Sequence, residues 1–268
     1  MTASIICLNM KYSLFPLRRA GMILLWLLLW QTISLFFANS IILVGPAEVI
    51  KALLPQVLKA DFWGTIWFSF GRISLGFCLA FLSGILTGGT ACRFPLLEEL
   101  LRPLISFFKS VPVASFIILA LIWMGSENLS VFIAFIVVFP VIYINTMSGI
   151  RSADGKLLEM AQVFSMPVGK KLFYIYRPAL LPYLISGCRV ALGMSFKSGI
   201  AAEVIGVPDH SIGEKLYMAK IYLSTADLFA WTLVILIISA IFETFFLKLL
   251  TLASPRTIKK EGDRETWN

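Results

Sequence analysis

Six long runs of mostly apolar residues set the strongest limit on how this 268-residue chain can fold. A helix needs roughly 20 such residues to cross the hydrocarbon core of a bilayer. The runs cover about 21–44, 62–90, 104–124, 129–150, 179–205 and 228–250. The composition agrees, because 59% of the residues are hydrophobic and only 14% are charged, against about a quarter in soluble domains. We therefore expect an all-α, polytopic membrane protein with about six transmembrane helices.

The first apolar run has two interpretations. Lys11, Arg18 and Arg19 precede it and Ala38-Asn39-Ser40 follows it, as in a secretory signal. Its length, however, exceeds the roughly 7–15 residues of the apolar region of such a signal. We interpret the run as an uncleaved membrane anchor.

The basic residues indicate which ends of the spans face the cytoplasm. With the N-terminus inside, the inner segments hold fifteen Lys and Arg residues, whereas the outer loops hold only Lys51, Lys59, Lys215 and Lys220. Cytoplasmic loops are enriched in Lys and Arg. The pattern predicts a multi-pass membrane protein with both termini in the cytoplasm. It also accounts for the net charge of +8 without nucleic acid as a partner.

The longest inner loop, 151–178, has the marks of two short helices. Asp154 can cap a helix that begins near Gly155. Ser165 then precedes Pro167, and proline is tolerated in the first turn of a helix. The pattern predicts a rigid helical projection with a tight joint, followed by a return to the membrane at Pro178 and Pro182. The alternative is a basic interfacial loop that binds lipid headgroups through Lys170, Lys171 and Arg177.

The same loop resembles the EAA loop of bacterial ABC importer permeases. That pattern has Glu-Ala-Ala, a Gly four residues after the second Ala, and a hydrophobic-Pro pair thirteen residues beyond the Gly. This chain has Glu159-Met160-Ala161, Ser165 at the Gly position and Arg177-Pro178 at the end. It departs from the pattern at Ser165, which would stiffen the joint, and at Arg177, which replaces an aliphatic residue.

The resemblance extends over most of the chain, from Lys59 to Leu250. Three further segments are similar to those of nitrate/sulfonate/taurine-type permeases. They are FWGTIWFSFGRISLGFCLAFLSGILTG (62–88), PLISFFKSVPVASFIILALIWMG (103–125) and GCRVALGMSFKSGIAAEVIG (187–206). The resemblance implies the fold of a type I ABC importer permease, with cytoplasmic coupling helices and cargo such as a sulfonate, taurine, nitrate or a heterocyclic vitamin precursor.

The resemblance also implies a division of labour among subunits. The 151–178 loop would dock on a separate ATPase subunit, and the residues assigned to coupling are Glu159, Ala161, Ser165, Lys170, Lys171 and Pro178. A second, identical permease chain and an extracytoplasmic substrate-binding protein would complete the importer. No GxxxxGK[ST] phosphate-binding loop occurs in the sequence, so this chain needs no cofactor and ATP belongs to the partner.

Charged residues inside the predicted spans are candidates for the translocation pathway. A charge at mid-bilayer costs about 2.5–3.5 kcal/mol on insertion scales, and Arg72, Lys197 and Glu203 are therefore expected to face the bundle interior or a watery cavity. Arg189 and Lys197 together are consistent with a pathway for an anion. Snorkelling toward an interface is the alternative, and it is the preferred interpretation for Arg189, which lies nearer the inner end of its span.

Small residues at four-residue spacing mark two helix faces, which let backbones approach closely. They include Gly76, Ala80, Gly84 and Gly88 in one span and Gly187, Ala191, Ser195 and Gly199 in another. We hypothesise that these faces pack together and that Arg72 pairs with Glu203. The alternative is two packing faces without such a pair.

The outer loop 207–227 predicts a further helix. Ser211 can cap it, and Ile212, Leu216, Ala219, Lys220 and Leu223 recur at helical spacing. We expect an amphipathic helix at the membrane surface, and the resemblance implies that such loops meet the binding protein. His210 is expected to be a surface residue only.

Three classes of protein fit these features. An importer permease explains all of them. A self-contained secondary transporter should carry more intramembrane carboxylates, and an intramembrane enzyme should have catalytic side chains at bilayer depth, whereas the one His lies in a loop. We expect neither catalytic nor metal-binding residues. The expected organisation is an N-terminal tail, first span and outer loop (1–58), a permease core (59–252) and a cytoplasmic C-terminal tail (253–268).

Overall fold

The computed structural model describes residues 21–36 and 43–252, and within them every regular element is a helix. This confirms the all-α class. The N-terminal and C-terminal tails lie outside the described residues. After the helix Gly21–Phe36, the elements are α2 (Pro46–Val57), α3 (Ala60–Arg93), α4 (Pro95–Ser110), α5 (Val113–Met124), α6 (Leu129–Arg151), α7 (Gly155–Val163), α8 (Val168–Lys171), a π-helical turn (Leu172–Tyr176), α9 (Arg177–Gly206), α10 (Ile212–Ile221) and α11 (Thr225–Leu252).

Four of the predicted spans exist as helices long and apolar enough to cross a membrane. They are α3, α6, α11 and the continuous helix Val168–Gly206 that contains α9. The first predicted span corresponds to Gly21–Phe36, which is shorter than a span requires by itself. The remainder of that run lies partly in 37–42, outside the described residues.

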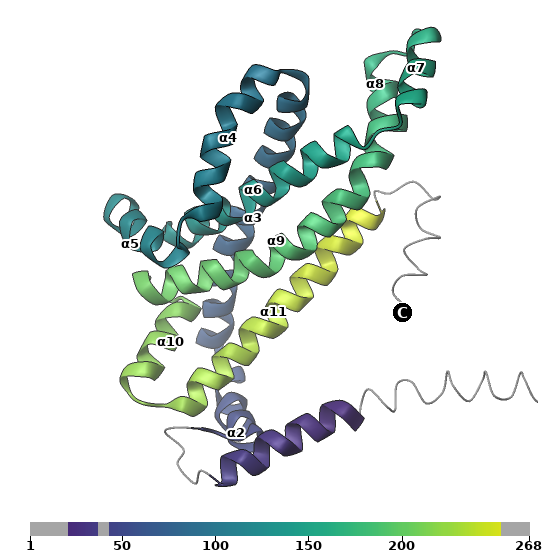
Figure 1. The fold of residues 1–268 in the computed structure, drawn as a ribbon. Helices are drawn as coiled ribbons and strands as arrows, with labels where there is room; N and C mark the ends of the chain where they lie inside the picture. Colours follow the sequence, from purple (N-terminus) through teal and green to yellow (C-terminus); the bar gives the residue numbers. More distant parts are fainter. Residues whose placement is uncertain (1–20, 37–42, 253–268) are drawn as a thin grey trace, which may run out of the picture. The chain divides into compact units, whose positions relative to one another are not determined.

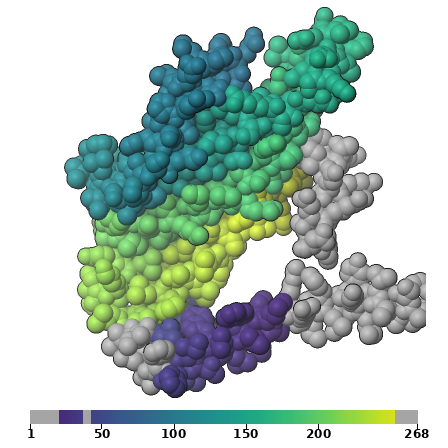
Figure 2. Space-filling model, viewed as in Figure 1, coloured from purple at the N-terminus to yellow at the C-terminus, as the bar shows by residue number. Residues whose placement is uncertain are grey.

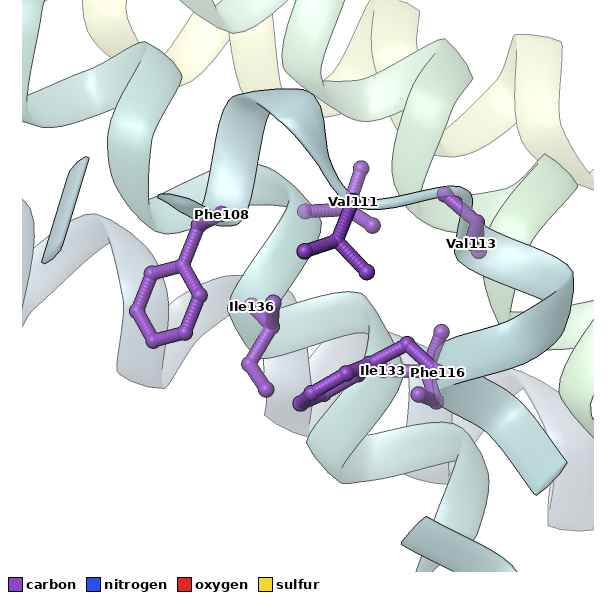
Figure 3. Close-up of a pocket in the computed structure, with 7 residues that line it drawn as sticks. Phe108, Val111, Val113, Phe116, Ile133 and Ile136 are labelled. Carbon is purple, nitrogen blue, oxygen red and sulfur yellow. The ribbon is translucent and has the colours of Figure 1, made fainter. Parts of the chain in front are cut away.

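The predicted span over 104–124 is present as a bent pair of helices rather than as one helix. The run is divided between α4 and α5, which meet at 107°. Pro112 causes the break because proline restricts the residue before it to extended backbone, and Val111 has φ −72° and ψ 129°. A small apolar cavity of about 10 Å³ lies inside this bend, lined by residues that include Phe108, Phe116 and Ile133 (Figure 3).

The described chain divides into two compact units. The smaller contains residues up to 62 together with 218–233. Its core consists of Val44, Val49 and Ala230, and the rings of Trp30 and Phe229 pack beside it with centroids 5.6 Å apart.

The larger unit comprises residues 63–217 and 234–252 of the described chain, and α6 and α9 form its central pair (Figure 1). Their backbones approach closely at two glycines. A Cβ on Gly149 would lie 2.8 Å from Leu180, and one on Gly187 would lie 2.7 Å from Asn145. Small residues at the contact allow this proximity.

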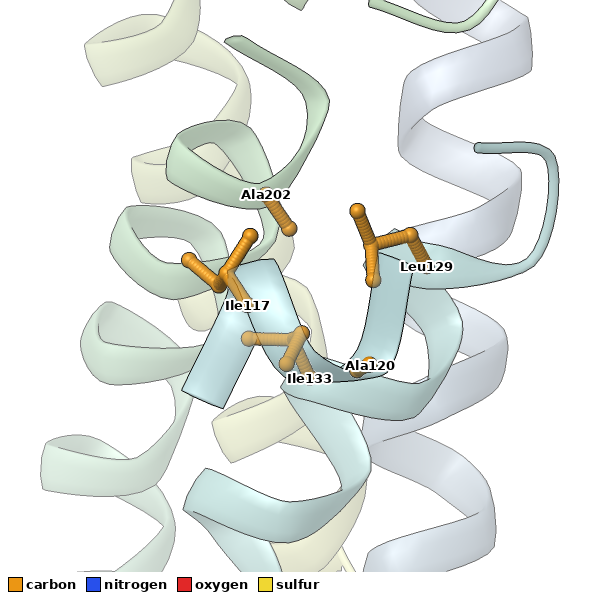
Figure 4. Close-up of a cluster of buried hydrophobic side chains, with 5 residues drawn as sticks. All are labelled: Ile117, Ala120, Leu129, Ile133 and Ala202. Atoms are coloured by element: carbon orange, nitrogen blue, oxygen red, sulfur yellow. The ribbon is translucent and has the colours of Figure 1, made fainter. Parts of the chain in front are cut away.

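A buried apolar cluster joins α5 to this central pair. Ile117 and Ala120 of α5 meet Leu129 and Ile133 of α6 and Ala202 of α9 (Figure 4). All five side chains are almost fully buried. The cluster therefore anchors the short helix that follows the bend.

An aromatic cluster joins α3 to α11 within the larger unit. Phe77 is fully buried and contacts Phe242 and Phe246 edge to face, with centroids 5.8 and 4.9 Å away. Each such pair contributes about 0.5–1.5 kcal/mol beyond area burial.

Candidate functional sites in the α7–α8 knob and among the buried charges

The 151–178 loop folds as the predicted pair of short helices, α7 and α8, which we call the α7–α8 knob (154–171). The knob stands beyond the adjoining ends of α6 and α9 (Figures 1 and 2). The predicted cap is confirmed, because the Asp154 carboxylate accepts a hydrogen bond of 2.9 Å from the Lys156 backbone N–H. The second helix begins at Val168 with Pro167 as its N-cap, as the pattern predicted.

The joint of the knob is a left-handed turn at Ser165. This residue has φ +48°, a conformation that favours glycine. The Met166 N–H donates to the Ala161 carbonyl and the Ser165 N–H donates to the Gln162 carbonyl, each at 2.9 Å. These two bonds form the Schellman motif that closes a helix. Ser165 thus occupies a position where the EAA pattern has glycine for a conformational reason.

The knob presents an apolar surface. Val163, Phe164 and Val168 are 80, 76 and 81% exposed, whereas Ala161 is completely buried. Glu159 and Lys170 are also exposed, and Lys171 is half-buried. Exposed apolar side chains that lie near charged ones are typical of interaction surfaces, so this surface is a candidate contact site.

The helix does not break at Pro178 and Pro182, contrary to the prediction of a boundary there. Val168–Gly206 is continuous, and Pro178 lies in the first turn of α9. The π-helical turn precedes it, and the Arg177 N–H donates to the Leu172 carbonyl. A proline lacks an N–H and crowds the carbonyl four residues back, and the wider turn gives that carbonyl room. The knob is therefore joined to the membrane helix without a flexible link.

Glu203 lies at the other end of α9 and is completely buried. Its Oε2 accepts hydrogen bonds from Ser69 Oγ at 2.7 Å and from the Gly213 N–H at 3.3 Å. Ser69 Oγ in turn accepts from the Ile212 N–H at 2.8 Å. The first N–H groups of a helix have no partner within the helix. Ser69 and Glu203 satisfy two of them in α10, so the carboxylate ties α3, α9 and α10 together.

The predicted ion pair between Arg72 and Glu203 is not formed. Arg72 pairs instead with Glu127, in the turn between α5 and α6, and its guanidinium lies 3.8 Å from the ring centroid of Phe68. The pairing hypothesis was wrong because Glu203 is already engaged by Ser69 and α10. Glu127 was not identified from the sequence as the partner of Arg72. An acidic residue in a short loop at the same end of the bundle could have suggested this pair.

The two small-residue faces do not pack against each other as hypothesised. The α3 face lies on α6, where a Cβ on Gly76 would be 2.3 Å from the Val131 carbonyl oxygen and one on Gly88 would be 2.9 Å from Thr146. The α9 face is shared, because Gly187 faces α6 and Gly199 faces Ile73 of α3. Thus both faces pack on α6 instead of on each other, apart from the contact of Gly199 with α3.

Lys197 projects from an exposed stripe of α9. The stripe runs along one side of the helix through Tyr183, Ser186, Val190, Met194 and Lys197. Arg189 flanks the stripe and is exposed as well. In the part of the chain that the structure describes, no ion pair involves Lys197 or Arg189.

The outer loop forms the predicted helix, α10. Ser211 is its cap, since Ser211 Oγ accepts from the Glu214 N–H at 3.0 Å, and His210 is exposed as expected. The first turn of α10, however, is buried against α9, where a Cβ on Gly213 would lie 2.3 Å from Glu203. The first turn of the helix is therefore anchored to α9, and its position at the membrane surface stays a prediction.

Comparison with known proteins identifies the family. Residues 76–259 match the model of the binding-protein-dependent transport system inner membrane component. The bicarbonate transport permease CmpB of Synechocystis is 32% identical over 68% of this chain and 69% of its own length.

Two further relatives have names that refer to sulfur compounds. SsuC of Bacillus subtilis, named for aliphatic sulfonates, is 28% identical over 81% of this chain and 79% of its own length. The taurine permease TauC of Escherichia coli is 26% identical, with 80% of each chain covered.

A crystal structure of an amino acid ABC transporter has the same fold. Its TM-score is 0.57 at 18% identity, and the match covers 80% of this chain and 99% of that one. ABC permeases of this family are not enzymes and act with separate ATPase and substrate-binding subunits. The chain belongs to the binding-protein-dependent transport system inner membrane component family, as a multi-pass ABC importer permease.

Proposed function

We propose that two identical copies of this chain form the translocation pathway of an importer for a small anionic solute. The α7–α8 knob would bind an ATPase subunit on the cytoplasmic side, where both termini would also lie. The observation that carries this proposal is the exposed apolar surface of the knob, joined to a membrane-crossing helix without a break.

The geometry of the knob favours transmission of force. Its joint is closed by two backbone hydrogen bonds, and α8 continues through the π-helical turn into α9. A displacement of the knob by a bound partner would therefore move α9 as a lever. Glu159, Lys170 and Lys171 would add charged contacts around the apolar surface, while Ala161, Ser165 and Pro178 would fix its shape.

Two observations support an anionic cargo, the names of two relatives and the exposed basic residues Lys197 and Arg189 of α9. Two of the relatives are named for sulfonates and bicarbonate, which are anions. Lys197 and Arg189 lie on an exposed side of α9 without a carboxylate partner among the described residues. Unpaired charges at membrane depth face a watery cavity rather than lipid.

The same stripe is our candidate for the contact with a second permease chain. Its small and apolar side chains would pack against their symmetry mates, with the pathway running between the copies. Arg72, which pairs with Glu127, and Glu203, which accepts hydrogen bonds from Ser69 and Gly213, would stabilise the helices around the outer end of that pathway. Residues 59–252 would form the permease core, and lipid would cover the remaining apolar surface.

Copurification tests the role of the knob. Phe164→Ser should abolish copurification with the ATPase subunit of the same importer, because it removes a 76% exposed apolar contact. Leu96→Ser alters a side chain of α4 that is 81% exposed and should leave the complex intact. Equal copurification of both variants would refute the docking role of the knob.

A further inference from the structure

We propose that a cavity between α4 and α6, which we call the inner-end cavity, binds a small oxyanion. It lies toward the end of the larger unit that carries the α7–α8 knob, and its volume is about 230 Å³. Its polar lining consists of Glu98, Arg102, Tyr143, Ser148 and Arg151. This site is separate from the α9 stripe, and the proposal does not depend on the nature of the cargo.

The charges of the cavity are unbalanced in favour of an anion. Glu98 Oε2 accepts from Arg151 at 2.5 Å, and Glu98 Oε1 lies 3.9 Å from Arg102. One carboxylate thus serves two guanidinium groups, each of which has five N–H donors. Guanidinium groups recognise oxyanions through paired hydrogen bonds. Glu98 holds Arg151 at the cavity and lies near Arg102, so both guanidinium groups keep donors available for a second anion.

Tyr143 gives an independent indication of a ligand. Its side chain is only 4% exposed, it lines the cavity, and its hydroxyl is buried without a hydrogen-bond partner among the described residues. A buried hydroxyl normally has a partner, and leaving it without one is unfavourable. An oxyanion bound between the arginines would accept a hydrogen bond from this hydroxyl.

The size and walls of the cavity limit the ligand. Its volume is below the roughly 300 Å³ at which sites for drug-sized ligands begin, so the cavity suits a small ligand. Ile105, Ile144 and Met147 supply apolar walls that accept a short carbon chain. The class that fits is sulfate, phosphate or a small sulfonate.

The position of the cavity next to the knob suggests what occupancy would do. Arg151 is the last residue of α6, and Asp154, which caps α7, follows three residues later. An anion that binds Arg151 would weaken its bond to Glu98 and change how the end of α6 is held. Binding would therefore alter how the base of the α7–α8 knob is held.

Calorimetry on the purified full chain in lipid nanodiscs tests this proposal, with sulfate and methanesulfonate as probes. At least one probe should bind the wild type. Tyr143→Phe should bind it on the order of tenfold more weakly, because a hydrogen bond to a charged group is lost. Glu98→Gln should bind it several-fold more tightly, since the competing negative charge is gone while the amide oxygen can still accept a hydrogen bond from Arg151. Arg93→Gln, which removes an exposed charge outside the lining, should bind like the wild type.

The outcomes divide cleanly. Binding of methanesulfonate alone would indicate an organic sulfonate as the ligand, whereas binding of sulfate would indicate an inorganic oxyanion, and both support the site. Absence of binding by both probes, undiminished binding by Tyr143→Phe, or weaker binding by Glu98→Gln would overturn it. Tyr143→Phe retains the ring and loses only an unpartnered hydroxyl, so its thermal unfolding should match the wild type and show that it folds.

Discussion

Single residues determine how the knob is shaped. Ser165 is one of four non-glycine residues with positive φ in the described chain, and it alone lies in the knob. Its place in the sequence pattern predicted a joint, but not the left-handed turn itself. That turn depends on the carbonyl groups of Ala161 and Gln162 being free to accept, which only the folded end of α7 provides.

Ser165→Gly should stabilise the knob. A non-glycine residue in the left-handed region costs about 1–2 kcal/mol, and the gain is reduced because glycine loses more entropy on folding. A net gain of about 1 kcal/mol corresponds to roughly fivefold slower amide exchange through local opening of the knob. Hydrogen exchange over residues 155–171 measures this. Ser152→Gly, at a C-cap with φ −79°, should not slow exchange, and faster exchange in Ser165→Gly would contradict the explanation.

Lys197→Gln should reduce uptake of an anionic cargo on the order of tenfold, because a hydrogen bond to a charged group contributes about 1.5–3 kcal/mol. Lys197→Arg keeps the charge and should retain most of the uptake. Lys248→Gln removes a charge from an exposed position of α11 and serves as the control. Initial uptake rates in reconstituted vesicles test this role of Lys197. Normal uptake by Lys197→Gln would show that the residue does not take part in translocation.

At the scale of elements, the apolar runs predicted α3, α6, α9 and α11 well because a membrane helix satisfies its own backbone and needs only length and apolarity. They failed where a local effect divided a run, as Pro112 does between α4 and α5. Helix contacts could not be predicted in the same way. The spacing of small residues marks a face, but it does not identify the helix that covers it.

Gly76→Ala should loosen the contact of α3 with α6. The added Cβ would lie 2.3 Å from the Val131 carbonyl oxygen, so the two helix backbones would have to separate. Gly71→Ala is the matched control in the same helix, because a Cβ there meets nothing within 4 Å. We expect a lower thermal unfolding temperature for Gly76→Ala and an unchanged or higher one for Gly71→Ala. Equal temperatures for the two variants would show that this contact is not tight.

At the scale of the whole molecule, the chain would act as the moving membrane subunit of an importer, driven by a separate ATPase subunit. The sequence could indicate this division of labour, because it lacks a phosphate-binding loop and has the spacing of the EAA loop. It could not predict the continuous path from the knob into α9, since Pro178 and Pro182 suggested a boundary. The path exists because the π-helical turn accommodates Pro178.

Solute uptake into vesicles measures this coupling most directly. Vesicles would contain the permease with or without its ATPase subunit, together with ATP, the substrate-binding protein and the labelled solute that this protein retains. We predict uptake only when the ATPase is present, its loss in Phe164→Ser and its retention in Leu96→Ser. Undiminished uptake by the permease without the ATPase would contradict the account.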